Sequence, residues 1–194
     1  MKVLAIGERP LTRLTALADL DVQMLADRVD LRDTQVIRCR RPSELPVKLE
    51  RLGARQLVTR LDVFDHGTEG MQMLGEGALF ASDAMPGSKL VGLELALQLE
   101  PYLTDTAQLR LLGCGTGEGT TGRMLLLKLA RALGGDRIVF GTIDRGTEVG
   151  FECGGPGAAI EHQRLFSSVA AIDTEAPRAR RRLENMQAIV AALR

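Results

Sequence analysis

Short apolar runs alternate along most of the chain with stretches in which apolar residues have helical spacing. Each run is rich in apolar or β-branched residues and is bounded by Gly, Pro or Asp, which is typical of a strand. The runs that predict strands cover residues 2–7, 34–38, 55–65, 109–113 and 137–143. Between them, apolar residues recur every three or four positions, which predicts helices over residues 11–18, 43–52, 90–102, 120–133 and 176–194.

Strands that alternate with helices in this way form a mainly parallel sheet with helices on both faces. We therefore predict an α/β fold, and the length of 194 residues fits a single domain, 1–194. Two features stand outside this alternation. Residues 70–74 and 78–82 flank Gly75-Glu-Gly77, which predicts a β-hairpin. Residues 165–172 fit either a last strand or a short helix.

Composition narrows the class of function. The 25 basic and 25 acidic residues give a formal net charge of zero, which argues against a nucleic-acid partner. No window holds the roughly 18 uninterrupted apolar residues of a membrane span. The three cysteines, Cys39, Cys114 and Cys153, form neither a disulfide framework nor a zinc-binding pattern. We therefore expect reduced thiols, a cytoplasmic location, no membrane association, and neither a metal nor a cofactor.

Two residues with useful chemistry stand where predicted strands end. His66 follows the strand 55–65, Cys114 follows the strand 109–113, and each is followed by a glycine. If these strands are parallel neighbours, both side chains emerge at the carboxyl edge of one sheet, where a thiol and an imidazole can act as nucleophile and acid–base group. The two residues lie 48 positions apart with the histidine first, and the separation in caspases is about 50.

The blocks around these two residues carry a family resemblance. Val63-Phe-Asp-His-Gly67, the hairpin after it, and Leu109-Arg-Leu-Leu-Gly-Cys114 resemble the caspase-like (clan CD) cysteine peptidases, most closely their compact bacterial and separase-like members. The resemblance covers residues 55–147, about half of the chain. True caspases carry Gln-Ala before the cysteine, where this chain has Leu112-Gly113, so aspartate specificity is not implied.

The resemblance implies a caspase-like three-layer sandwich and a thiol protease, a hydrolase that acts on protein or peptide substrates. Cys114 would be the nucleophile, His66 the acid–base group, and the N–H groups of Gly67 and Cys114 the oxyanion hole. A positive His66 and the start of the helix 120–133 would favour the thiolate. Asp144 would line a pocket for Arg or Lys, or would be a plain turn carboxylate. Oligomeric state stays open.

The glycine-rich stretch also supports a rival interpretation. Residues 112–117 resemble the first motif of S-adenosylmethionine-dependent methyltransferases, residues 117–122 satisfy the pattern GxGxxG, and Asp144 could bind a ribose. Leu111 stands where that motif usually carries an acid, and Asp144 lies 31 residues after Gly113, against about 20 in nucleotide folds. A third possibility is a catalytically inactive caspase-like binding module, although the presence of both dyad residues argues against it.

The other cysteine, histidine, acidic and arginine residues that stand out in the sequence are expected to have structural or surface roles. Cys39 follows a strand and is expected to pack in the core. Asp65 could orient His66, but strand alternation directs it to the other face. No strand pattern positions Cys153 and His162, and the basic residues in 178–182 fit a solvated helix start.

Overall fold

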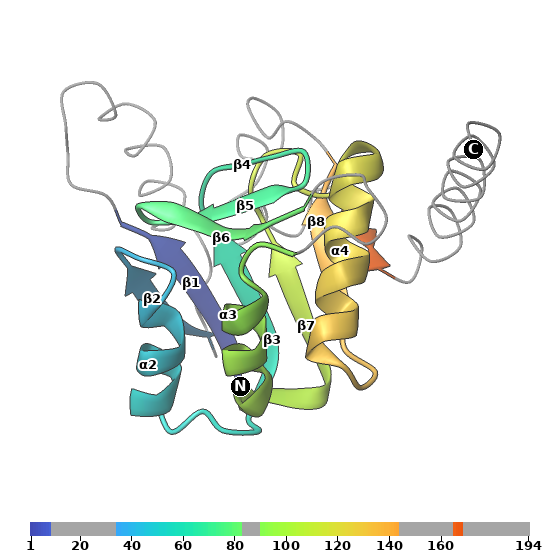
Figure 1. Ribbon diagram of the computed structural model, residues 1–194. Coiled ribbons are helices and arrows are strands. Elements are labelled where there is room, and N and C mark those ends of the chain that lie inside the picture. The colour runs from blue at the N-terminus through green and yellow to red at the C-terminus, as the bar shows by residue number, and fades with distance from the viewer. Residues whose placement is uncertain (9–33, 83–89, 144–164, 169–194) are drawn as a thin grey trace, which may run out of the picture.

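The computed structural model describes residues 1–8, 34–82, 90–143 and 165–168 (Figure 1). Six strands form the central sheet in the order β2-β1-β3-β7-β8-β9. The first five are parallel, and β9 runs antiparallel to β8. This confirms the predicted α/β class with a mainly parallel sheet. The strands are β1 (Lys2–Gly7), β2 (Thr34–Cys39), β3 (Val58–Phe64), β7 (Leu103–Leu111), β8 (Ile138–Thr142) and β9 (Leu165–Ser167).

A second, small sheet lies at the carboxyl edge of the parallel strands (Figure 1). It consists of β4 (Gly67–Thr68), β5 (Met71–Leu74) and β6 (Gly77–Ala81), all antiparallel. The hairpin of β5 and β6 confirms the sequence prediction. The two-residue strand β4 directly after His66 was not predicted, because two residues are too few to show a strand pattern.

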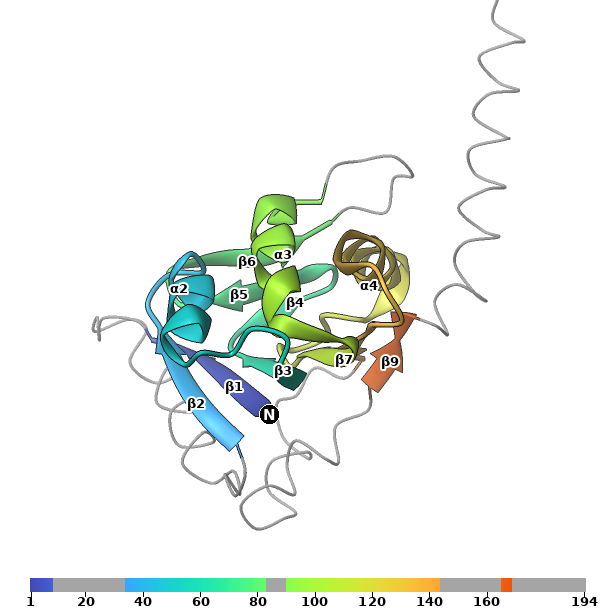
Figure 2. The ribbon, with the colours of Figure 1, turned by 90° about the horizontal axis from the view of Figure 1, so that it is seen from below.

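Three helices cover one face of the central sheet (Figure 2). They are α2 (Glu44–Arg51), α3 (Leu93–Leu99), which continues into the short 3-10 helix η1 (Glu100–Tyr102), and α4 (Gly119–Leu133). Gly53 follows α2 with a φ of 62° and Gly134 follows α4 with a φ of 65°, which are left-handed conformations that favour glycine after a helix. The helices expected over 11–18 and 176–194 lie outside the described residues.

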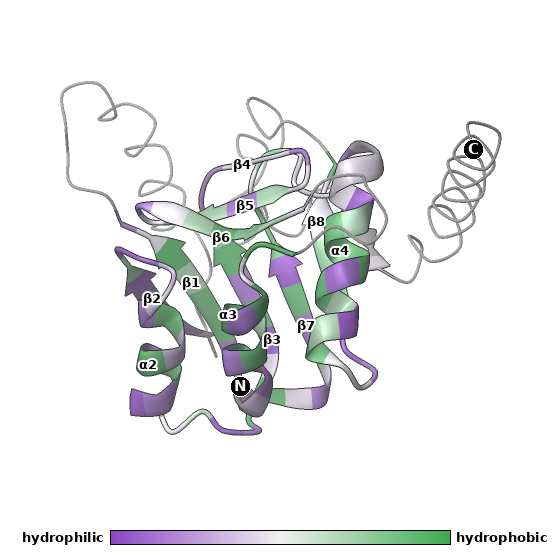
Figure 3. Cartoon of the chain, in the orientation of Figure 1, coloured by the Kyte–Doolittle hydropathy of each residue, from purple (hydrophilic) through white to green (hydrophobic). Residues whose placement is uncertain are grey.

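The main core lies between these helices and the sheet, and it uses every second residue of each strand. Figure 3 shows the apolar sides of the helices turned toward the sheet. Leu4, Ile6 and Phe64 point to the opposite face and are also buried, so both faces of the sheet are covered, which is consistent with a three-layer sandwich. Buried core residues on the helix side include Val3, Ala5, Leu61, Val63, Leu109, Leu111, Leu125, Leu129 and Val139.

The strand that precedes Cys114 differs from its predicted bounds. The apolar run predicted a strand over 109–113, whereas β7 extends over Leu103–Leu111. In its first half, polar residues separate the buried Leu103 and Ala107, so this half carries no continuous apolar run. At the other end, Leu112 and Gly113 belong to the turn. Residues 165–167, which fitted a strand or a helix, form the strand β9.

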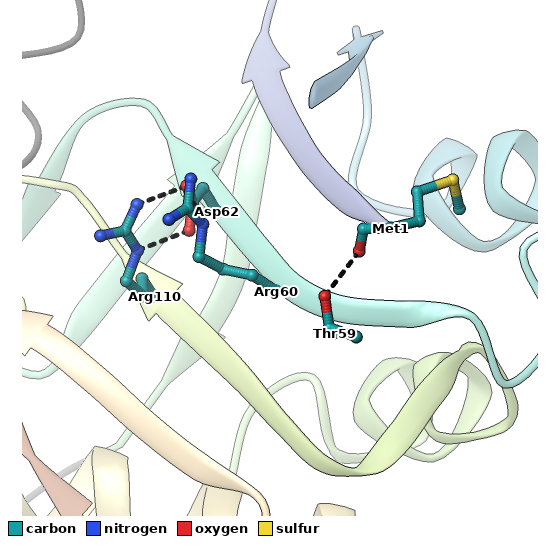
Figure 4. Close-up of polar contacts among 5 residues, drawn as sticks. All are labelled: Met1, Thr59, Arg60, Asp62 and Arg110. Carbon is teal, nitrogen blue, oxygen red and sulfur yellow. Dashed lines mark hydrogen bonds and ion pairs between the residues drawn. The ribbon is translucent and has the colours of Figure 1, made fainter. Parts of the chain in front are cut away.

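A buried ion pair joins the two strands that end at His66 and Cys114 (Figure 4). Asp62 of β3 lies opposite Arg110 of β7. The guanidinium donates from Nε and Nη2 to the two carboxylate oxygens, at 2.6 and 2.5 Å. Arg60 Nε lies 3.2 Å from the same carboxylate. Since both partners are at least nine-tenths buried, this pair holds β3 and β7 in one register.

Candidate active site

His66 and Cys114 follow adjacent parallel strands. The ladder between β3 and β7 ends at the pair Val63 and Leu111, and the N–H of Leu112 continues it by donating to the carbonyl of Val63 at 2.8 Å. Both turns therefore leave the same edge of the sheet side by side, which meets the condition on which the sequence hypothesis depended.

The two turns touch through their glycines. A Cβ atom added to Gly113 would lie 2.8 Å from both Cα and N of Gly67, and one added to Gly67 would lie 2.9 Å from Cα of Gly113. Only glycine at both positions permits this approach. Since consecutive Cα atoms are 3.8 Å apart, the contact holds the Cα atoms of His66 and Cys114 within about 12 Å of each other.

The two cysteines that the structure describes differ in their surroundings. Cys114 is a free, half-buried thiol at the sheet edge, and His66 is half-buried as well. Cys39 is fully buried, as expected for a packing residue. Burial raises the pKa of the Cys39 thiol to about 12, so that thiol stays protonated at neutral pH.

The backbone before Cys114 is anchored on both sides. The N–H of Gly113 donates to Oε1 of Gln72 at 2.9 Å. Its carbonyl accepts hydrogen bonds from Oγ1 of Thr142 and from N–H of Thr116, the latter at 3.3 Å. Within the described part of the chain, the N–H of Cys114 itself has no acceptor.

The N–H of Gly67 is directed away from the hairpin. The N–H of Met73 donates to the carbonyl of His66 at 3.0 Å, which makes these two residues a hydrogen-bonded pair. Hydrogen-bonded and non-hydrogen-bonded pairs alternate along an antiparallel ladder. The next pair, Gly67 and Gln72, is therefore of the second kind, and the N–H of Gly67 points away from β5.

Asp65 fixes the turn that carries His66. Its carboxylate accepts hydrogen bonds from the N–H groups of His66 and Gly75, each at 2.6 Å. A Cβ on Gly7 would overlap this carboxylate, so the end of β1 must be glycine. Asp65 is buried, and these contacts set the backbone of the turn against β1 and the hairpin.

The N-terminus of α4 is already occupied by a carboxylate. Oε1 of Glu69 accepts a hydrogen bond from the N–H of Thr121 at 3.3 Å, and the Glu69 carboxylate lies against Gly119. This acid offsets the positive end of the helix. The expectation that the helix start favours a Cys114 thiolate stays a prediction, with Glu69 as a competing charge at that helix end.

Internal packing explains the glycine-rich loop. A Cβ on Gly117 would lie 2.7 Å from the carbonyl oxygen of Gly141, and one on Gly122 would lie 2.8 Å from Cα of Gly117. Together with the contact of Gly113 with Gly67, these approaches account for three of the glycines that resembled a nucleoside-binding motif.

Several sequence candidates lie outside the described residues, namely Asp144, Cys153, His162 and the basic residues in 178–182. In the part of the chain that is described, His, Cys, Asp and Glu side chains form no group of three or more that could hold a metal ion. No helix in that part has the length and apolarity to cross a membrane. Neither a protein-family model nor a curated protein matches the chain.

Sequence reasoning missed three polar residues that build the site: Gln72, Thr116 and Thr142. All three are nearly or fully buried. Gln72 could have been found, because it is the single polar residue within the run Met71–Leu74, and a polar side chain in such a run must have a buried partner. Thr116 and Thr142 lie in turns or at strand ends, where threonine is unremarkable.

Proposed function

We propose that the chain is a cysteine endopeptidase in which Cys114 is the nucleophile and His66 the acid–base group. The observation that carries the proposal is the juxtaposition of the two turns: His66 and Cys114 stand in the turns that follow neighbouring parallel strands, and the glycines beside them touch. A half-buried free thiol at a sheet edge suits a nucleophile, because it is accessible to substrate and partly shielded from water.

In the proposed reaction, the Cys114 thiolate attacks the carbonyl carbon of a peptide bond. The negative charge that develops on the carbonyl oxygen would be stabilised by the N–H groups of Gly67 and Cys114. Protonated His66 donates its proton to the leaving amine, and the C–N bond breaks to leave a thioester. Neutral His66 then takes a proton from the water that attacks the thioester, and the C–S bond breaks to release the carboxylic acid and restore the Cys114 thiolate and protonated His66.

The order of the small sheet and the two sequence blocks is the one that the family resemblance implies. The small sheet follows His66 directly, and the hairpin in it separates the His-Gly block from the Gly-Cys block, as the resemblance implies. The resemblance supports a protein or peptide substrate and a caspase-like fold, and the sparse, free cysteines support a cytoplasmic location. A preference for Arg or Lys before the scissile bond would come from Asp144, which follows β8 by two residues.

The methyltransferase alternative needs glycines that a nucleoside can approach, whereas Gly113 packs against Gly67 and Gly117 packs against Gly141, which favours the peptidase proposal. Titration calorimetry with S-adenosylmethionine checks this directly. We expect no heat of binding at micromolar concentrations, whereas micromolar affinity would restore the alternative.

Covalent labelling tests the peptidase proposal and also separates it from an inactive binding module. The wild-type protein is incubated with a mixture of peptidyl chloromethyl ketones that differ in the residue before the reactive group. We expect one adduct, at Cys114, which the substitution His66→Ala slows by at least about 100-fold. The matched control is Cys39→Ala, which should label at the wild-type rate. Labelling that is independent of His66 would contradict the proposed dyad.

A further inference from the structure

Gln72 connects the two turns of the candidate site. It lies in the middle of β5, and its side chain is fully buried. Its Oε1 accepts a hydrogen bond from the N–H of Gly113, at 2.9 Å, and so reaches the residue directly before Cys114. Its Nε2 donates to the carbonyl of Met73 at 2.9 Å and lies 3.4 Å from the carbonyl of His66.

The partners fix the orientation of this amide. The N–H of Gly113 is only a donor, so the atom that faces it must be the oxygen. The carbonyls of His66 and Met73 are only acceptors, so the atom that faces them must be the nitrogen. Asparagine is too short to span both sides, and no other uncharged side chain of this length combines an acceptor with donors.

Thr116 closes the network from the far side of the Cys114 turn. Its Oγ1 lies 3.2 Å from Oε1 of Gln72 and 3.0 Å from the carbonyl oxygen of Gly113. The side chain is fully buried. Both backbone polar groups of Gly113 are thereby held by buried side chains, so the direction in which the chain enters Cys114 is determined by this network.

We propose that Gln72 is a positioning residue that locks the Cys114 turn to the His66 hairpin. A contribution of Gln72 to catalysis rests on the proposed function, whereas the hydrogen bonds that form the lock do not depend on it. The lock holds the backbone that enters Cys114 against the hairpin that follows His66. A displacement of about 1 Å in such a site is enough to lower kcat about 100-fold.

The test compares Gln72→Met, which keeps the length but removes the donors and acceptor, with Gln72→Glu, which keeps the acceptor for Gly113. NMR-detected hydrogen exchange measures the lock, with Leu112 as the reference amide, since its bond to Val63 lies in the sheet ladder. We expect exchange at Gly113 to become at least about tenfold faster in Gln72→Met while Leu112 is unchanged. Gln72→Glu should show a smaller effect.

Peptide hydrolysis provides the second readout. We expect Gln72→Met to lower kcat at least about tenfold with KM within about threefold, because the substrate site is not contacted. If the variant does not fold, Thr116→Val is measured instead, with the same expectations. Its hydroxyl contacts both Gln72 and Gly113.

The outcomes are distinguishable. Unchanged exchange at Gly113, or equal acceleration at Leu112, overturns the lock. Faster exchange at Gly113 with unchanged kcat overturns the positioning role. If the wild-type protein shows no hydrolysis that depends on Cys114, the proposed function fails, and the exchange measurement still decides whether Gln72 holds the turn.

Discussion

Gly67 lies with its backbone directly against the backbone of Gly113, so the residue after His66 touches the residue before Cys114. A Cβ at either position would approach the other residue's Cα to within 2.9 Å or less. The two glycines are 46 residues apart in sequence, and the turns that hold them leave neighbouring strands at the same edge of the sheet. The contact makes the spacing of the proposed dyad sensitive to a single methyl group.

Gly67→Ala should therefore be damaging in two ways. The added methyl group would overlap Oγ1 of Thr116 and press on Gly113, which we expect to destabilise the fold by about 1–3 kcal/mol. It would also displace one proposed oxyanion donor, which lowers kcat by about 100-fold or more. Urea denaturation and peptide hydrolysis measure the two effects.

Gly77→Ala is the matched control, because it lies in the same small sheet and its added Cβ would meet Pro42 at an ordinary 3.5 Å. We expect near-wild-type hydrolysis from this control. Equal losses of activity in Gly67→Ala and Gly77→Ala would mean that the small sheet tolerates no substitution, and would remove the special role of the Gly67 contact.

The cysteines should differ in reactivity. At pH 7.5 iodoacetamide should alkylate Cys114 in the folded protein at least about 100-fold faster than Cys39, because Cys39 is buried and its thiol is protonated. Peptide mapping by mass spectrometry after timed quenching identifies each site. Denaturation in urea before labelling should make the two rates similar, and rapid labelling of Cys39 without denaturant would contradict its buried position.

Cys39 also predicts a dependence of stability on pH. Burial raises its folded-state pKa to about 12, from an ordinary value of 9.0. A raised pKa means that the unfolded chain loses the proton first, so stability is fully present below pH 9 and declines as the pH rises toward 12. Unfolding free energies of wild type and Cys39→Ala, measured from pH 7 to 11, should converge above pH 9. Parallel curves would show that Cys39 ionises as easily folded as unfolded.

The buried pair of Asp62 and Arg110 should matter for stability mainly when it is broken. Arg110→Met leaves the Asp62 carboxylate, among the residues that the structure describes, with the contact from Arg60 alone, and we expect a loss of about 3–5 kcal/mol in urea unfolding. The double variant Asp62→Leu, Arg110→Met removes both charges and should recover most of that loss. A double variant as unstable as the single one would show that the packing of the Arg110 side chain, and not its charge, stabilises the pairing of the two strands.

Arg137 is a second buried cation, and it links two elements of the fold through hydrogen bonds. Its guanidinium donates to the carbonyls of Leu133, Thr104 and Leu103, at 2.5 to 3.0 Å, and so ties the end of α4 to the start of β7. Arg137→Met should cost about 2–4 kcal/mol, since buried carbonyls lose their donors. Circular dichroism during thermal unfolding measures the loss, and Arg131→Met, on the exposed side of α4, should be nearly neutral.

The sequence was informative where one pattern dominates the local structure. The apolar runs before His66 and Cys114 predicted two strands of a mainly parallel sheet, because such strands are buried on both faces and read as continuous apolar segments. That the two are neighbours was only a condition of the site hypothesis, and the structure supplies it. The end of α2 and the hairpin of β5 and β6 depend on single residues with strong conformational preferences, such as Gly53 and Gly75.

The remainder depends on contacts between distant segments, which no local pattern encodes. The first half of β7 pairs with β3 at Leu103 and Val58, the register then shifts, and pairing with β8 starts at Gln108, so this half follows neither an apolar run nor a regular ladder. The partner of Gln72 is 41 residues away, at Gly113. Similarly, Glu69 contacts the N-terminus of α4 at Thr121, which is 52 residues away in sequence.

The substrate preference depends on Asp144, which follows β8 in the sequence. If this carboxylate pairs with the residue before the scissile bond, Asp144→Asn should lower kcat/KM for an Arg substrate at least about 100-fold and leave a matched Gln substrate within threefold. Both rates are measured with fluorogenic peptides that differ at that one residue. An Arg preference that survives the substitution would show that another group forms the pocket.

The central claim is that the Cys114 sulfur cleaves peptide bonds with the help of His66. The most direct measurement is the rate of hydrolysis of a fluorogenic peptide mixture, varied at the residue before the scissile bond, by wild type, Cys114→Ala and His66→Ala. We expect hydrolysis by the wild type, and a loss of at least about 1,000-fold in each variant. Equal rates for wild type and Cys114→Ala, or no hydrolysis of any peptide by the wild type, would contradict the account.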